Sequence, residues 1–308
     1  MARKNKNELI DSQLKTRYAD IRLDKVFKLV FAEDEGNMTL LVKFMNCMLP
    51  AVKVHEVTFV NKEMHGETVD DKDCVFDVYC TTDTNEHILI EMQYKLSSDF
   101  LDRTLFYSTY PIRSQIINRI KEEKKRMEEM GLRGPVVIPY NLDAVHVVSI
   151  INGSLVHDKK TELEDGLICR YALREQTSGE IMTRALDFTV MELDRMNYGP
   201  THPEKCKTLV QKVAFVLKYI TYFNEQPEEL KGDLLDDLFH AVEMASWSFE
   251  RKNEYVKIMM TASDYAKYLA EQIEKNRKEI AKALLLKDIS PEVTSESTGL
   301  SIEVLKSL

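Results

Sequence analysis

The chain has 308 residues and a formal net charge of −9, with 44% hydrophobic and 30% charged residues. This composition is typical of a globular protein with a sizeable core, and the acidic balance argues against a protein that holds nucleic acid through overall basic charge. The five cysteines form no C-x-x-C pair, so a zinc ribbon or a thioredoxin-like site has no support, and their wide spacing favours reduced thiols. Because there is no secretory signal and no apolar run near the ~20 residues of a membrane span, we predict a cytoplasmic protein without membrane association.

Helical and strand patterns alternate in the first part of the chain. Apolar spacing predicts helices at residues 23–31 and 38–49, with a polar break between them and Pro50 ending the second. Strand patterns follow at residues 55–61, 73–81 and 87–94. The short polar turn between the last two strands indicates a β-hairpin.

A long helical pattern at residues 99–120, with Pro111 as a candidate interruption, follows the hairpin. Strand patterns return at residues 144–151, 167–171 and 185–193. Beyond about residue 203 only helical patterns remain, at residues 207–222, 230–245 and 263–287. Strands and helices followed by helices alone predict an α/β core with an α-helical C-terminal region.

The domain organisation follows from these patterns. Residues 1–15 are polar without a clear period and are predicted to be disordered, and residues 16–200 form the α/β core. Residues 201–275 form a helical region, and residues 276–308 form a small helical tail. The spacing of the tail is compatible with a helix-turn-helix, but its last helix carries few basic residues, so a packing or dimerisation module is the alternative.

The hairpin carries carboxylates inside otherwise apolar strands. Side chains alternate along a strand, so Asp77 shares a face with Tyr79, and Glu91 shares a face with Gln93 on the next strand. Two carboxylates on adjacent strands offer half of the oxygen shell that Mg²⁺ prefers. The pattern of an acid, a gap and then acid-x-Lys is that of the PD-(D/E)XK nucleases, with Gln93 in place of the lysine. The alternative is a solvent-facing strand edge with scattered polar residues.

Several motifs in order resemble the recombination-promoting nuclease and transposase family, a branch of the PD-(D/E)XK nucleases. They are LDKVFKLVF at 23–31, LLVKFMNCML at 40–49, IEMQ at 90–93, Arg103 with Tyr107, FTVMELDRM at 188–196 and STGLSIEVLKSL at 297–308. The resemblance extends over about residues 16–308 and departs from the usual pattern in the ELDRM stretch. It implies a restriction-endonuclease-like core, in which a mixed central sheet is flanked by helices.

The resemblance also implies roles for individual residues. Asp77 and Glu91 would be catalytic metal ligands, and Asp24 would complete the metal shell, unless it only favours the N-terminus of its helix. Gln93 would be a catalytic residue that orients water or phosphate through hydrogen bonds, because an amide carries no positive charge.

Three further residues are candidates for DNA binding. Arg103 and Tyr107 lie four residues apart on one helix face, where Arg103 could contact a phosphate. A structural ion pair and a core tyrosine are the alternative. Lys28 could likewise contact DNA or extend from a helix surface.

The function implied is that of a Mg²⁺-dependent DNA endonuclease linked to recombination or mobile DNA, in which Mn²⁺ could replace Mg²⁺. The alternative is a PD-(D/E)XK-fold binding module with little or no activity that acts through DNA or protein contacts, which Gln93 and the acidic net charge favour. Retention of Asp77 and Glu91 on one face favours the nuclease. A homodimer is expected for an enzyme that cuts two strands with one site per chain.

Overall fold

The computed structural model describes residues 14, 16–32, 38–60, 63–64, 74–155, 164–287 and 289–306. The predicted disordered segment 1–15 lies outside these residues except for residue 14. The chain divides into two compact units, and the boundary falls between Ser246 and Trp247. Within the described ranges, no helix combines the length and the apolar character that crossing a bilayer requires.

A mixed sheet of six strands forms the centre of the first unit. In spatial order the strands are β1 (Val57–Phe59), β4 (Val78–Thr82), β5 (His87–Gln93), β6 (Val145–Ile151), β8 (Leu186–Glu192) and β7 (Ile168–Ala172). β5, β6 and β8 run parallel to one another, whereas β1, β4 and β7 pair antiparallel with their neighbours. The predicted α/β core with a mixed central sheet is therefore confirmed.

The strand predicted at residues 73–81 is divided in the structure. Its first part, β3 (Cys74–Val75), pairs with β2 (Glu63–Met64) in a separate two-stranded sheet, and its second part is β4. Between them, the carboxylate of Asp77 accepts a hydrogen bond from the backbone N–H of Met92. The pairing of β4 with β5 starts at the next residue, Val78, so this contact lies at the edge of the backbone ladder.

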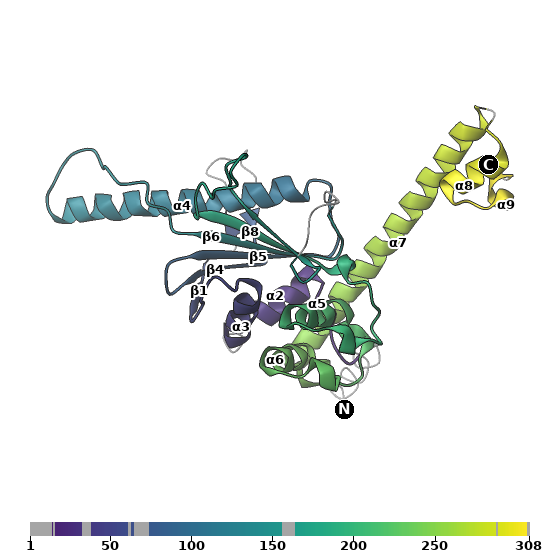
Figure 1. Ribbon diagram of the computed structural model, residues 1–308, viewed down its shortest axis with the longest axis horizontal. Helices are drawn as coiled ribbons and strands as arrows, with labels where there is room; N and C mark the ends of the chain where they lie inside the picture. The colour runs from purple at the N-terminus through teal and green to yellow at the C-terminus, as the bar shows by residue number, and fades with distance from the viewer. Residues whose placement is uncertain are drawn as a thin grey trace. The chain divides into compact units, whose positions relative to one another are not determined.

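Helices cover both faces of the sheet (Figure 1). The long helix α4 (Phe100–Glu129) lies along one face, where Tyr107 packs edge-on against Phe76. It continues through the buried Pro111, so the predicted interruption does not occur. The opposite face carries α2 (Asp24–Phe31), α3 (Met38–Met48) and α5 (Leu209–Tyr219). α2 and α3 join through an aromatic cluster of Phe27, Phe31 and Phe44.

The helix α6 (Asp233–Val242) packs against α3 and α5 and belongs to the same unit as the sheet. The helical region predicted to begin after residue 200 is therefore not separate from the core at that point, because the apolar faces of α5 and α6 are buried against α3. Short 3₁₀ turns complete the unit at Leu193–Arg195, Pro203–Lys205, Ile220–Tyr222, Glu228–Leu230 and Met244–Ser246.

The second unit consists of one long helix and two short ones. α7 (Phe249–Leu285) begins where the Ser248 side chain accepts the N–H of Arg251, earlier than the predicted start at residue 263. α8 (Pro291–Thr298) ends at Gly299 in a left-handed conformation, and α9 (Ile302–Leu305) has four residues. Leu300 and Leu305 pack with Ala281 of α7. A last helix of little more than one turn supports the packing alternative for the tail over a DNA-reading helix.

The buried His146 of β6 makes the stability of the first unit dependent on pH. Burial alone lowers the pKa of His146, but the hydrogen bond between its Nδ1 and Asp187 at 2.8 Å, with Glu86 nearby, raises that pKa above its usual value. The stabilisation is therefore complete below the unfolded pKa and is lost as pH rises through the folded pKa. We therefore expect the free energy of unfolding to fall as the pH rises from the unfolded pKa of histidine, about 6.5, through the higher folded pKa.

Urea titrations at several pH values measure this effect, with His146→Gln as the comparison. The variant should be less stable at the acid end and should lack this part of the pH dependence. Equal slopes for the two proteins would contradict the assignment to His146.

Candidate active site

Asp77 and Glu91 face each other across the hairpin. β4 and β5 pair in a register that sets Val78 opposite Ile90, and one further step places Asp77 opposite Glu91. Both carboxylates are buried, at 5% and 8% relative exposure. The Oδ2 atom of Asp77 accepts the N–H of Met92 at 2.8 Å, and the backbone of Asp77 donates in turn to Glu91. The local strand geometry therefore fixes the two acids beside each other, as predicted from their alternation.

The environment of Glu91 disfavours its charge. Burial and then the neighbouring Asp77 raise the pKa of Glu91 well above its usual range, while Lys28 and Arg103 act in the opposite direction. The Oε1 atom is buried and has no hydrogen-bond partner among the described residues. A buried carboxylate oxygen without a partner costs free energy. A cation or a bound water beside Oε1 would offset this cost.

Lys28 supplies a positive charge inside this site. Its ammonium nitrogen lies 3.1 Å from Oδ1 of Asp77, and its side chain is three-quarters buried. Lys28 reaches the carboxylates from α2, which packs against β5. It therefore lies within the acidic cluster and does not extend from an outer helix surface.

Asp24 lies close to the same cluster. Burial, and then the charge of Asp77, raises the pKa of Asp24 to about 6, while Lys28 and the backbone N–H of Tyr94 lower it. Asp24 as a residue is nevertheless exposed at the first turn of α2, so the burial of its carboxyl group is only partial. Among the described residues no group of three or more His, Cys, Asp or Glu side chains has the spacing to hold a metal ion. Asp24 is thus an acid beside the pair, and its role as a third ligand stays a prediction.

Gln93 and Arg103 are brought together. The guanidinium of Arg103 donates a hydrogen bond to the amide oxygen of Gln93, and the amide nitrogen of Gln93 donates to the carbonyl of Met92 at 3.3 Å. Tyr107, one turn further along α4, packs its ring against the core residue Phe76. Arg103 therefore positions Gln93 at the site, whereas Tyr107 belongs to the packing between α4 and the sheet.

Sequence reasoning missed Ser149 at this site. In the parallel pairing of β5 with β6, Ser149 is the partner of Glu91, so the two side chains lie on the same face. Ser149 is fully buried and its hydroxyl has no hydrogen-bond partner among the described residues. The only signal in the sequence is one hydroxyl inside an apolar strand, and its significance depends on a long-range register.

The arrangement of donors fits a divalent cation. The two buried carboxylates supply hard oxygen ligands. Oε1 of Glu91 and the hydroxyl of its register partner Ser149 are both buried without a hydrogen-bond partner among the described residues. Metal sites of this kind keep several water ligands, so two protein carboxylates suffice for a weak site. Asp77 and Glu91 are the residues that would hold the ion.

Comparison with known proteins gives no significant match among curated proteins and none among solved structures. The family model described as PD-(D/E)XK nuclease family transposase matches residues 21–272, which include the whole sheet, both carboxylates of the hairpin, and Lys28. The paired acids on adjacent strands and the mixed sheet agree with that match. The chain belongs to the PD-(D/E)XK nuclease family transposases.

Proposed function

We propose that this protein is a metal-dependent DNA endonuclease that hydrolyses phosphodiester bonds, with a role in recombination or in the movement of mobile DNA. Membership of a nuclease-like transposase family supports this proposal. The observation that carries it is the buried pair Asp77 and Glu91, held opposite each other with one carboxylate oxygen unsatisfied. Two carboxyl groups buried beside each other, one of them with an oxygen that has no partner among the described residues, are typical of a functional site.

Asp77 and Glu91 would hold Mg²⁺, or Mn²⁺ in its place. When bound, such an ion acts as a Lewis acid on the phosphate and lowers the pKa of a water molecule. The protein residues would bind the ion, keep bulk water away from its buried side and orient the phosphate. Asp24, whose pKa is raised to about 6, would contribute a further carboxyl group next to the pair on its solvent-facing side.

Lys28 would supply the positive charge that the lysine of the acid-x-Lys pattern supplies, because position 93 is a glutamine here. An ammonium group beside the scissile phosphate stabilises developing negative charge, which the amide of Gln93 cannot do. The ion pair of Lys28 with Asp77 places that charge at the carboxylates. Gln93, fixed by Arg103, would orient the phosphate or the attacking water through hydrogen bonds. A lysine from α2 thus replaces the one that the strand lacks.

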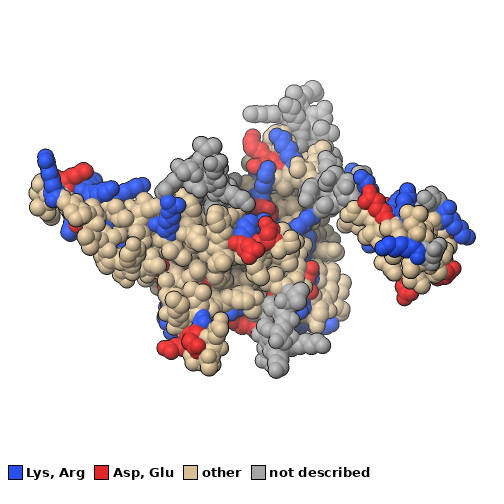
Figure 2. All heavy atoms as spheres, turned by 90° about the horizontal axis from the view of Figure 1, so that it is seen from above, with Lys and Arg blue, Asp and Glu red and all other residues tan. Residues whose placement is uncertain are grey.

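DNA would contact the protein through local basic surfaces, because the chain as a whole is acidic. Figure 2 shows basic side chains at the end of α4 that projects beyond the sheet, with acidic side chains among them. Residues 121–129 there read KEEKKRMEE. Such mixed charge supports modest, salt-sensitive binding. A homodimer would bring two sites to the two strands of a duplex.

Cleavage of supercoiled plasmid tests the proposal. Purified protein should nick or linearise the plasmid with Mg²⁺ or Mn²⁺, EDTA should abolish this, and Glu91→Ala should reduce it to background. Cleavage that persists in Glu91→Ala would assign the activity to a contaminant or to another site. The folded state of each protein is checked by its thermal transition.

A binding module is the second candidate, and the absence of a three-carboxylate group among the described residues favours it. Under this alternative, folded wild-type protein cleaves no more than Glu91→Ala in any metal, yet retains DNA binding. The same plasmid experiment, followed by a gel-shift measurement, separates the two functions.

A further inference from the structure

Asp77, Glu91 and Ser149 lie in one row across three neighbouring strands. β4 pairs with β5 from Val78 opposite Ile90, which places Asp77 opposite Glu91, and β5 pairs with β6 so that Glu91 is the partner of Ser149. Partner residues of neighbouring strands direct their side chains to the same face of the sheet, and the strands lie about 4.8 Å apart. Glu91 therefore has Asp77 on one side and Ser149 on the other.

Ser149 and Glu91 each contain a buried polar atom that has no hydrogen-bond partner among the described residues. These atoms are the hydroxyl oxygen of Ser149 and Oε1 of Glu91. Buried polar groups are nearly always paired, because desolvation without a partner costs free energy. A hydroxyl can donate one hydrogen bond, whereas an ionised carboxylate can only accept, so the two groups are chemically complementary.

Glu91 is the polar neighbour of Ser149 in this row. The register partner of Ser149 on β8 is Val190, which has no polar side-chain atom. Ser149 follows Val147 on the face that packs against α4 (Figure 1). The buried hydroxyls of α4, Thr104 and Ser108, are already engaged, since each donates to a backbone carbonyl of its own helix. Within the row, the carboxylate of Glu91 is therefore the acceptor that remains for the hydroxyl of Ser149.

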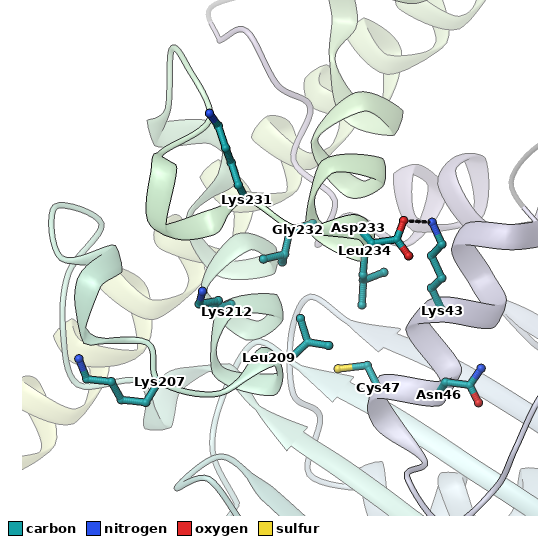
Figure 3. A pocket seen from close by; sticks show the side chains of 11 residues that line it. Lys43, Asn46, Cys47, Lys207, Leu209, Lys212, Lys231, Gly232, Asp233 and Leu234 are labelled. Atoms are coloured by element: carbon teal, nitrogen blue, oxygen red, sulfur yellow. Dashed lines mark hydrogen bonds and ion pairs between the residues drawn. The ribbon is translucent and has the colours of Figure 1, made fainter.

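The open pocket among α3, the start of α5 and the start of α6 contains no comparable pair of groups. Its volume is about 470 Å³, and Figure 3 shows its lysine side chains pointing in different directions. Lys43 is held by Asp233, and Lys231 is held by Glu228. In the described part of the chain, none of the buried side-chain atoms without a hydrogen-bond partner belongs to the residues that line this pocket.

We propose that Ser149 is a positioning residue of the metal site, and that its hydroxyl donates a hydrogen bond to Glu91 when this carboxylate binds the cation. This role rests on the proposed function, in which Asp77 and Glu91 hold a divalent ion. Residues that bind metal ions are usually hydrogen-bonded by a further group, which fixes their orientation and strengthens binding of the ion. Ser149 does this from β6, on the side of Glu91 opposite to Asp77, and acts through Glu91 without touching the ion.

Calorimetric titration of Mn²⁺ into the full chain, in the absence of DNA, tests this role independently of cleavage. Ser149→Ala should weaken Mn²⁺ binding by about 10- to 100-fold, the usual effect of removing a partner of a metal-binding residue. Ser149→Cys should weaken it to a similar degree, because a thiol fills the space of the hydroxyl but is a weak donor. Glu91→Ala should abolish binding. In EDTA, Ser149→Ala should unfold at a temperature no lower than the wild type, since the hydroxyl has no partner among the described residues.

Ser108→Ala is the matched control, because it removes a hydroxyl that is equally buried but donates to the carbonyl of Leu105 at 2.7 Å. It should leave the Mn²⁺ affinity unchanged. Wild-type affinity in Ser149→Ala or in Ser149→Cys, or an equal loss in Ser108→Ala, would overturn the role of Ser149 while the metal site stands. If the wild type binds no Mn²⁺, or binds it no better than Glu91→Ala, the metal site of the proposed function fails, and the role of Ser149 fails with it.

Discussion

Replacing Glu91 with Gln is expected to abolish cleavage while making the metal-free protein more stable. The loss should be roughly a thousandfold or more, since a bound metal supplies several kcal/mol of transition-state stabilisation. Stability should rise because burial and Asp77 both disfavour the charge of Glu91, and because its Oε1 atom has no hydrogen-bond partner among the described residues. Urea unfolding in EDTA at neutral pH measures the second effect, and plasmid cleavage in Mg²⁺ measures the first.

Glu192→Gln is the matched control for this variant. Glu192 is also fully buried, but its carboxylate accepts the N–H of Leu155 at 2.8 Å and the guanidinium of Arg195 at 3.1 Å. Weakening these charge-assisted bonds should cost about 1–3 kcal/mol of stability. The two substitutions should therefore change stability in opposite directions. A destabilised Glu91→Gln would mean that Glu91 is a structural residue.

Removing the ammonium group of Lys28 is expected to separate cleavage from metal binding. Lys28→Ala should lower the cleavage rate about a hundredfold, because a charge directed at the transition state is lost. Divalent metal should bind equally well or more tightly, since Lys28 no longer competes for Asp77. Lys28→Arg should recover part of the activity. Isothermal titration with Mn²⁺ and plasmid cleavage give the two readings.

Lys25→Ala is the control, because Lys25 is an exposed lysine on the same helix. It should leave cleavage, metal affinity and stability unchanged. If Lys28→Ala cleaves as well as the wild type, the positively charged side chain that stabilises the transition state is a residue other than Lys28. If it loses metal binding together with cleavage, Lys28 acts by shaping the site and not by contacting the phosphate.

The hairpin and the position of its acids could be predicted from the sequence because both depend on local pattern. Residue alternation with period two fixed the faces of Asp77 and Glu91, and a short polar turn fixed their strands as neighbours. The long-range parts could not be obtained in this way. The contact of Lys28 with Asp77 depends on how α2 packs against the end of β5, and the place of Ser149 depends on a parallel register.

Other differences have equally local causes. Pro111 was a candidate break, but α4 accommodates it on the buried face, where packing against the sheet outweighs one missing backbone hydrogen bond. Sequence pattern therefore shows which side chains share an element and not which elements meet.

Two backbone amides at the end of β5 and just after it donate to acids of the proposed site, so their hydrogen exchange can report whether the site is occupied. The N–H of Met92 donates to Asp77, and the N–H of Tyr94 donates to Asp24. The same carboxylates that form the proposed site thus protect two amides from solvent. Protonation of either acid, or its withdrawal toward an ion, changes that protection. Hydrogen exchange at Met92 and Tyr94 is therefore an intrinsic reporter of what the site holds, independent of any substrate.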